Sequence, residues 1–70
     1  MIEKSLKKIG QNIKYVRKSQ KLSQEKLAER IGVSRNYIGM IERAEVNIPT
    51  KTLLEIAMAL NVHPKTFYDY

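Results

Sequence analysis

Hydrophobic residues recur at helical spacing along almost the whole chain, and no segment shows the strict alternation of a β-strand. The first apolar stripe predicts a helix over about residues 5–20, because its members lie three or four positions apart. These members are Leu6, Ile9, Ile13 and Val16. The opposite face of the same helix is basic, with Lys7, Lys8, Lys14, Lys18 and Lys21. One face is therefore expected in a core and the other in solvent.

Local signals mark the next two helices. Ser23 is an N-cap residue, and Glu25 places a negative charge in the first turn, where the positive end of a helix favours it. Gly32 is the residue best able to adopt the left-handed conformation that ends a helix. Ser34 is a second N-cap. We therefore expect one helix over residues 24–31 and another over about 35–43.

The rest of the chain predicts two further helices. Thr50 is expected to cap a helix over about residues 51–60, which Asn61 ends. Pro64 suits the first turn of a short helix over about 64–68. The expected fold class is all-α, with five short helices.

Two short helices joined by a glycine turn over about residues 23–43 predict a helix-turn-helix. Helices that cross steeply need a small residue where they touch, and Ala28 supplies it. Gly32 tolerates the positive φ of the turn. Ile38 and Ile41 are expected to face the core.

The outer face of the second helix carries Arg35 and Asn36 in its first turn. Arginine can donate two hydrogen bonds to guanine, and asparagine can form a similar pair with adenine. Either residue alone fits an ordinary solvated surface. In combination with the helix-turn-helix pattern, they indicate a helix that contacts base edges.

Charge supports a polyanionic partner. Thirteen Lys and Arg residues oppose seven Asp and Glu residues, for a net charge of +6. Residues 1–22 hold seven of the basic residues and a single acidic one. This clustering favours nucleic acid over acidic lipid as the partner.

Composition excludes several other classes of protein. The chain has no cysteine, which rules out disulfides and thiol chemistry and makes the reducing cytoplasm the expected compartment. Its single histidine, His63, cannot build a two-histidine metal site, so neither a metal nor another cofactor is expected. No nucleophile–base pair or phosphate-binding loop suggests an enzyme. No apolar run reaches the roughly 18 residues of a membrane span, and no small-molecule ligand is evident.

Seventy residues allow one hydrophobic core, so residues 1–70 are expected to be a single domain.

The segment LSQEKLAERIGVS at residues 22–34, followed by Ile41-Glu42-Arg43, resembles the Cro/phage-repressor (XRE) helix-turn-helix family. The likeness covers about residues 9–68. Tyr37-Ile38 and Asn47-Ile48 extend it to the controller proteins of restriction–modification systems. The resemblance implies a five-helix lambda-repressor-like domain that regulates transcription by binding a double-stranded DNA operator. One recognition helix contacts only a few base pairs, so we expect a homodimer on a (pseudo)palindromic operator, with half-sites about 34 Å apart.

The resemblance also implies a role for each matching residue at the DNA. Gln24, at a helix N-terminus, would bind a backbone phosphate. Arg35 and Asn36 would contact base edges in the major groove. Ser34 and Tyr37 would contact phosphate or flanking bases.

Two further residues of the resemblance, Arg43 and Asn47, would bind phosphates beyond the recognition helix. Arg17 would form a salt bridge with Glu42 and tie the first helix to the recognition helix. Arg17 is therefore expected to be structural.

Three positions depart from the family pattern. Met40 can offer DNA only apolar contact, for instance to a thymine methyl group. Gly39 lies inside the recognition helix, where it either permits close approach to DNA or is a tolerated drift. Ala44 replaces a common glycine, which leaves the geometry of the following loop open.

The aromatic C-terminus has two interpretations. Phe67, Tyr68 and Tyr70 form either a lid on the core or a dimer interface. The interface is favoured, with Leu60 and Val62 contributing to it. An alternative function is an antitoxin-like or accessory protein-interaction module of the same fold, which would bind a partner through these aromatics.

Overall fold

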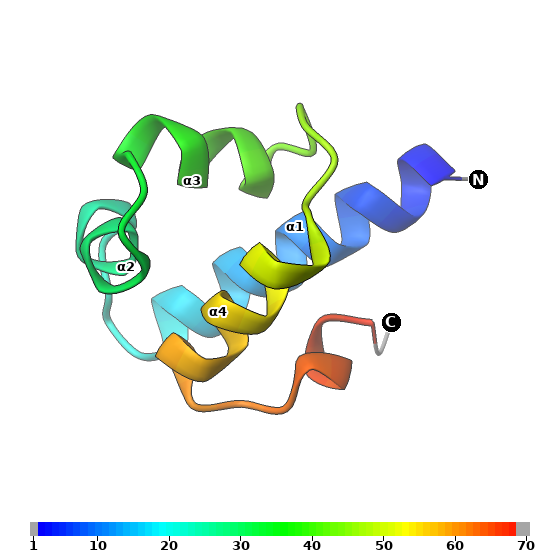
Figure 1. Ribbon diagram of the computed structural model, residues 1–70. Helices are drawn as coiled ribbons and strands as arrows, with labels where there is room; N and C mark the ends of the chain where they lie inside the picture. The colour runs from blue at the N-terminus through cyan, green and yellow to red at the C-terminus, as the bar shows by residue number, and fades with distance from the viewer. Residues whose placement is uncertain (1, 69–70) are drawn as a thin grey trace.

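The computed structural model describes residues 2–68, which form four α-helices followed by a short 3₁₀ helix and contain no β-strand. The elements are α1 (Ile2–Ser19), α2 (Gln24–Ile31), α3 (Arg35–Glu42), α4 (Thr50–Leu60) and η1 (Pro64–Phe67). Figure 1 shows α3 crossing steeply over α2, which is seen nearly end-on. The all-α class and the helix-turn-helix are as expected.

The cap residues determine where α2 and α3 begin and end. The Ser23 hydroxyl accepts a hydrogen bond from the backbone N–H of Lys26 at 3.0 Å, and the Ser34 hydroxyl accepts one from Tyr37 at 3.1 Å. Gly32 ends α2 in the left-handed conformation, with a φ of 74°. The three predictions made from these residues are confirmed.

Three expectations about element boundaries need correction. The first helix begins at Ile2, about one turn before the apolar stripe. Thr50 is the first residue of α4 and not its cap, since Pro49 occupies the cap position and provides no side-chain hydrogen bond. The expected fifth α-helix is a four-residue 3₁₀ helix, closed by a bond from the Tyr68 N–H to the Lys65 carbonyl. A segment this short gains too few hydrogen bonds to propagate as an α-helix.

Every element contributes to one hydrophobic core. The largest fully buried side chains are Phe67, Ile13, Leu27, Ile38, Ile56 and Leu60. Helix α1 and the residue that follows it also bind the C-terminal part of the chain through hydrogen bonds. Asn12 donates to the carbonyl of Phe67 at 2.9 Å, and Gln20 donates to that of Leu60 at 2.6 Å.

This packing corrects the expected dimer interface. Phe67 and Leu60 are 0% exposed, so within the monomer both side chains belong to the core and neither can form a surface patch. Val62 is half-buried against the same core, whereas Tyr68 is 48% exposed. The expectation for Tyr70 lies outside the described residues. Phe67 is thus the lid that the sequence analysis kept as its second interpretation.

Helices α1 and α3 touch at Gly10. A Cβ atom added to Gly10 would lie 2.6 Å from the carbonyl oxygen of Glu42 and 2.7 Å from that of Ile41. Backbone atoms cannot yield at such distances without moving a helix. Gly10 therefore sets how closely α1 approaches the C-terminal end of α3.

We expect Gly10→Ala to lower the free energy of unfolding by about 1–3 kcal/mol, because α1 and α3 must separate. Urea denaturation followed by circular dichroism measures the change. Gly39→Ala is the matched control, since its added Cβ would meet only the movable end of the Arg43 side chain. It should leave stability unchanged or raise it by about 0.5–1 kcal/mol through better helix propensity. Equal losses for both variants would contradict the close-contact role of Gly10.

Removal of the Phe67 ring should destabilise the monomer. Phe67→Ala is expected to lower the free energy of unfolding by about 3–5 kcal/mol, and Tyr68→Ala by much less. Thermal melting checks both variants. A Phe67→Ala protein that melted like the wild type and changed only its sedimentation would restore the interface interpretation.

Candidate nucleic-acid interface

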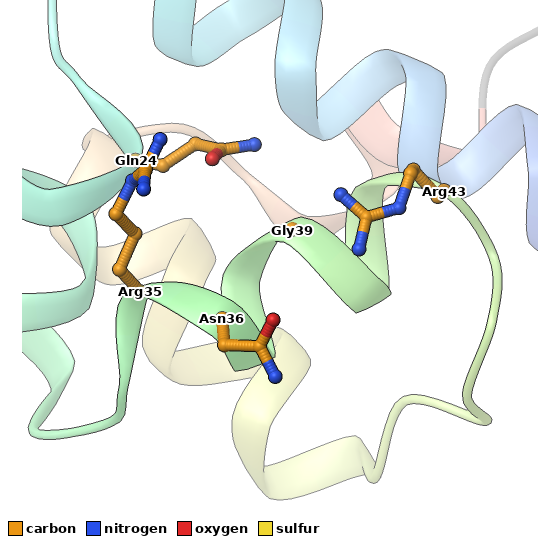
Figure 2. Close-up of a pocket in the computed structure, with 5 residues that line it drawn as sticks. All are labelled: Gln24, Arg35, Asn36, Gly39 and Arg43. Carbon is orange, nitrogen blue, oxygen red and sulfur yellow. The ribbon is translucent and has the colours of Figure 1, made fainter.

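The N-terminus of α2 and the outer face of α3 enclose a shallow pocket. It is lined by Gln24, Arg35, Asn36, Gly39 and Arg43. In Figure 2, Gln24 comes from α2, Arg35, Asn36 and Gly39 lie along α3, and Arg43 is the residue that caps the end of α3. All four polar side chains carry N–H donors, so the surface suits a ligand rich in acceptors, such as phosphates and base edges.

A buried ion pair fixes the position of α3. Arg17 Nε lies 2.7 Å from Glu42 Oε2, and Arg17 Nη2 donates to Glu42 Oε1 at 3.1 Å. The two residues are only 5% and 6% exposed, so each charge requires a partner in place of water. Arg17 Nη1 also donates to the carbonyl of Leu22 at 2.7 Å. One side chain of α1 thus holds both the end of α3 and the segment before α2.

Gln24 has a structural contact as well as a place in the pocket. Its Nε2 donates to Glu42 Oε1 at 3.0 Å, which adds α2 to the network of Arg17 and Glu42. The second amide hydrogen of Gln24 has no partner among residues 2–68. Gln24 is half-buried, so its side chain is oriented before any ligand binds.

Arg35 and Asn36 project from the first turn of α3 and are exposed. Within the described part of the chain, Arg35 forms no ion pair. Asn36 Nδ2 lies 3.7 Å from the sulfur of Met40, one turn along the helix. The pair of side chains with the strongest capacity for base contacts is therefore available on the surface.

The remaining candidate residues lie outside the pocket. Ser34 uses its hydroxyl oxygen as the cap of α3, and Tyr37 is half-buried against the core. Met40 is also half-buried, while Asn47 is exposed in the loop between α3 and α4. The exposed lysines of α1 do not line the pocket either.

The loop after α3 contains a contact that the sequence analysis missed. Ala44 adopts a left-handed conformation with a φ of 59°, the geometry that glycine provides more easily. This turn brings Glu45 back to Arg43, whose Nε donates to Glu45 Oε2 at 2.8 Å and whose Nη2 donates to Oε1 at 3.3 Å. The hydrogen bond from Arg43 lowers the pKa of Glu45 and raises that of Arg43, so both groups are charged at neutral pH. The only signal in the sequence was an Arg and a Glu two positions apart.

Residues 2–68 also lack the features of two other kinds of site. No helix there has the length and apolar character required to cross a membrane. The same residues contain no cluster of three or more His, Cys, Asp and Glu side chains that could hold a metal ion.

The paired helices α2 and α3 define a helix-turn-helix domain. The chain belongs to the helix-turn-helix family HTH_3, whose model matches residues 13–67. It is 45% identical over 53 residues to the control protein C.SmaI of Serratia marcescens, covering 76% of this chain and 63% of the relative. It is 44% identical over 54 residues to an immunity repressor of Bacillus phage phi105, covering 77% of this chain and 38% of the repressor. The chain therefore spans less than two thirds of the length of both relatives.

A solved structure supports the same assignment. The crystal structure of the restriction-modification controller protein C.AhdI from Aeromonas hydrophila matches with a TM-score of 0.87 and 36% identity, over 90% of this chain and 96% of that one. The resemblance to XRE-type regulators and controller proteins is thus confirmed. The relatives named here are a control protein, a repressor and a controller protein, and none of these comparisons indicates an enzyme.

We expect Arg17→Met to lower the free energy of unfolding by about 3–5 kcal/mol, because Glu42 is left as a buried charge without its guanidinium. The double variant Arg17→Met/Glu42→Leu should recover much of this loss, since no buried charge remains. Arg43→Ala is the matched control, as it removes an exposed ion pair, which solvent screens and which contributes little to stability. Urea denaturation of the three variants is the measurement. A double variant less stable than Arg17→Met would contradict the uncompensated-charge explanation.

Proposed function

We propose that this chain is a sequence-specific DNA-binding transcriptional regulator that binds a (pseudo)palindromic operator as a homodimer, with α3 in the major groove. The observation that carries the proposal is the first turn of α3. Arg35 and Asn36 are both exposed there, on a helix whose other end is held by a buried ion pair. Because the helix that carries these donors is fixed in position, its backbone loses little entropy when they bind base edges.

The surrounding residues supply contacts to the DNA backbone in this proposal. The free amide hydrogen of Gln24, at the N-terminus of α2, is suited to a phosphate oxygen. Ser34 and Tyr37 would contact phosphate or flanking bases, and Asn47 a phosphate beyond α3. Met40 would contribute apolar contact only.

Of the dimer interface first expected, Phe67 and Leu60 are buried, so a dimer needs other apolar side chains that are exposed. The apolar side chains that remain exposed on α4 are Leu54, at 44%, and Met58, at 80%, and Tyr68 follows η1. These side chains, together with Ile2 and Tyr15 on α1, are exposed and available to a second copy. The burial of Phe67 also weakens the alternative of an interaction module, since that module would have used Phe67 as its main aromatic contact.

Selection of binding sites from random duplex DNA tests the proposal, followed by affinity measurements on the selected site. Arg35→Ala should cost about 1–3 kcal/mol of binding there and relax the preference at one base pair. It should melt like the wild type, since Arg35 is exposed. Lys65→Ala, which removes an equal charge from the exposed side of η1, is the control and should bind normally.

Two outcomes would contradict the proposed function. One is a wild-type protein that enriches no sequence. The other is an affinity that stays flat between about 50 and 200 mM salt, because phosphate contacts release counterions.

A further inference from the structure

Arg43 is held in an orientation that an ordinary phosphate-binding arginine does not need. Its guanidinium turns back along α3 and lies against Gly39, as Figure 2 shows. Nη1 lies 2.9 Å, and Nη2 3.6 Å, from the position that a Cβ of residue 39 would occupy. Any other residue at position 39 would displace this guanidinium. Gly39 thus leaves the space that Arg43 fills.

Glu45 holds the same guanidinium from one side. Its carboxylate accepts from Nε at 2.8 Å and from Nη2 at 3.3 Å. A guanidinium has five N–H donors, so the edge formed by Nη1 and the outer hydrogen of Nη2 stays free. Both side chains are about half exposed, at 55% and 50%, and this edge borders the pocket that Arg35 and Asn36 line.

The carboxylate also changes which ligand suits Arg43. A phosphate approaching Arg43 would meet the negative charge of Glu45 within a few ångströms of the guanidinium, so the attraction is largely cancelled. A base edge carries no net charge and is not repelled in this way. Guanine presents two acceptors, O6 and N7, at the spacing of the free guanidinium edge.

We propose that Gly39, Arg43 and Glu45 act together to contact a guanine in the major groove. Glu45 orients the Arg43 guanidinium over Gly39, which has no side chain to displace it. Arg43 is then a specificity-determining residue in place of a phosphate contact, and Glu45 is its positioning residue. This inference rests on the proposed function, because it assigns a base contact to a protein that binds operator DNA.

The experiment compares variants on the site that the wild type selects from random duplex DNA and on its single-base-pair substitutions. Arg43→Ala should lose about 5- to 150-fold in affinity for the selected site and lose its preference at one G·C pair. Gly39→Ala keeps both charges but displaces the guanidinium, and Glu45→Gln removes the orienting charge. Both should weaken the preference at that same pair by at least about fivefold.

Two controls separate orientation from charge and from folding. Glu29→Gln removes an equal charge from an exposed pair with Lys26 on α2, and should leave the base preference unchanged. Glu45→Gln should bind unrelated DNA more tightly than the wild type, because it removes a repulsive charge. Thermal melting verifies that Gly39→Ala is folded.

Different results would overturn this inference and the proposed function on which it rests. Arg43→Ala could lower the affinity for every sequence equally and reduce the slope of log affinity against log salt by about 0.9. That result would identify a phosphate contact and overturn the inference alone. A Gly39→Ala protein with the full wild-type preference overturns it as well. A wild type that enriches no site overturns the proposed function and this inference together.

Discussion

The ion pair between Arg17 and Glu42 is the interaction on which the position of α3 depends. Helix α3 has eight residues, too few to be stable alone, so tertiary contacts must hold it. Its apolar side supplies Ile38 and Ile41 to the core, which fixes its rotation. The buried charges then fix its end, because neither can leave the other without losing its compensation. The first turn of α3, at the opposite end, remains free for a ligand.

The same end of α3 is also fixed through its backbone. Gly10 brings α1 within van der Waals distance of the carbonyl of Glu42, the residue whose side chain Arg17 holds. Backbone and side chain are therefore both fixed at one place, and Gln24 adds α2 to the same carboxylate. Three helices converge on Glu42. A helix supported in this way loses little conformational freedom on binding a ligand, which is the condition for affinity from only a few contacts.

Local chemistry made most of the fold predictable from the sequence. Ser23, Gly32 and Ser34 act on backbone groups within three residues of themselves, and the helices they delimit were correctly placed. Helical periodicity does not say which apolar side chains pack together, so it could not decide whether Phe67 is buried or exposed. That burial depends on a 3₁₀ helix held beneath α1 by Asn12, a contact between residues 55 positions apart. The need for glycine at position 10 was equally hidden, because it arises from the backbone of another helix.

The candidate site was predictable in its exposed residues and not in their pairing. Exposure follows from position on an amphipathic helix, and Arg35 and Asn36 could be identified from it. The partner of Arg43 depends on the left-handed turn at Ala44, which the sequence left open. This pairing alters the electrostatics that composition suggests: Arg17 is neutralised by Glu42 and Arg43 by Glu45, whereas Arg35 has no acidic partner within residues 2–68. These three arginines look alike in the composition, but they differ in the structure. Arg17 is structural, Arg43 is oriented by a carboxylate, and Arg35 has no acidic partner within residues 2–68. In the proposed function, the net charge draws the chain toward a polyanion, while the exposed Arg35 and the oriented Arg43 provide the preference for a sequence.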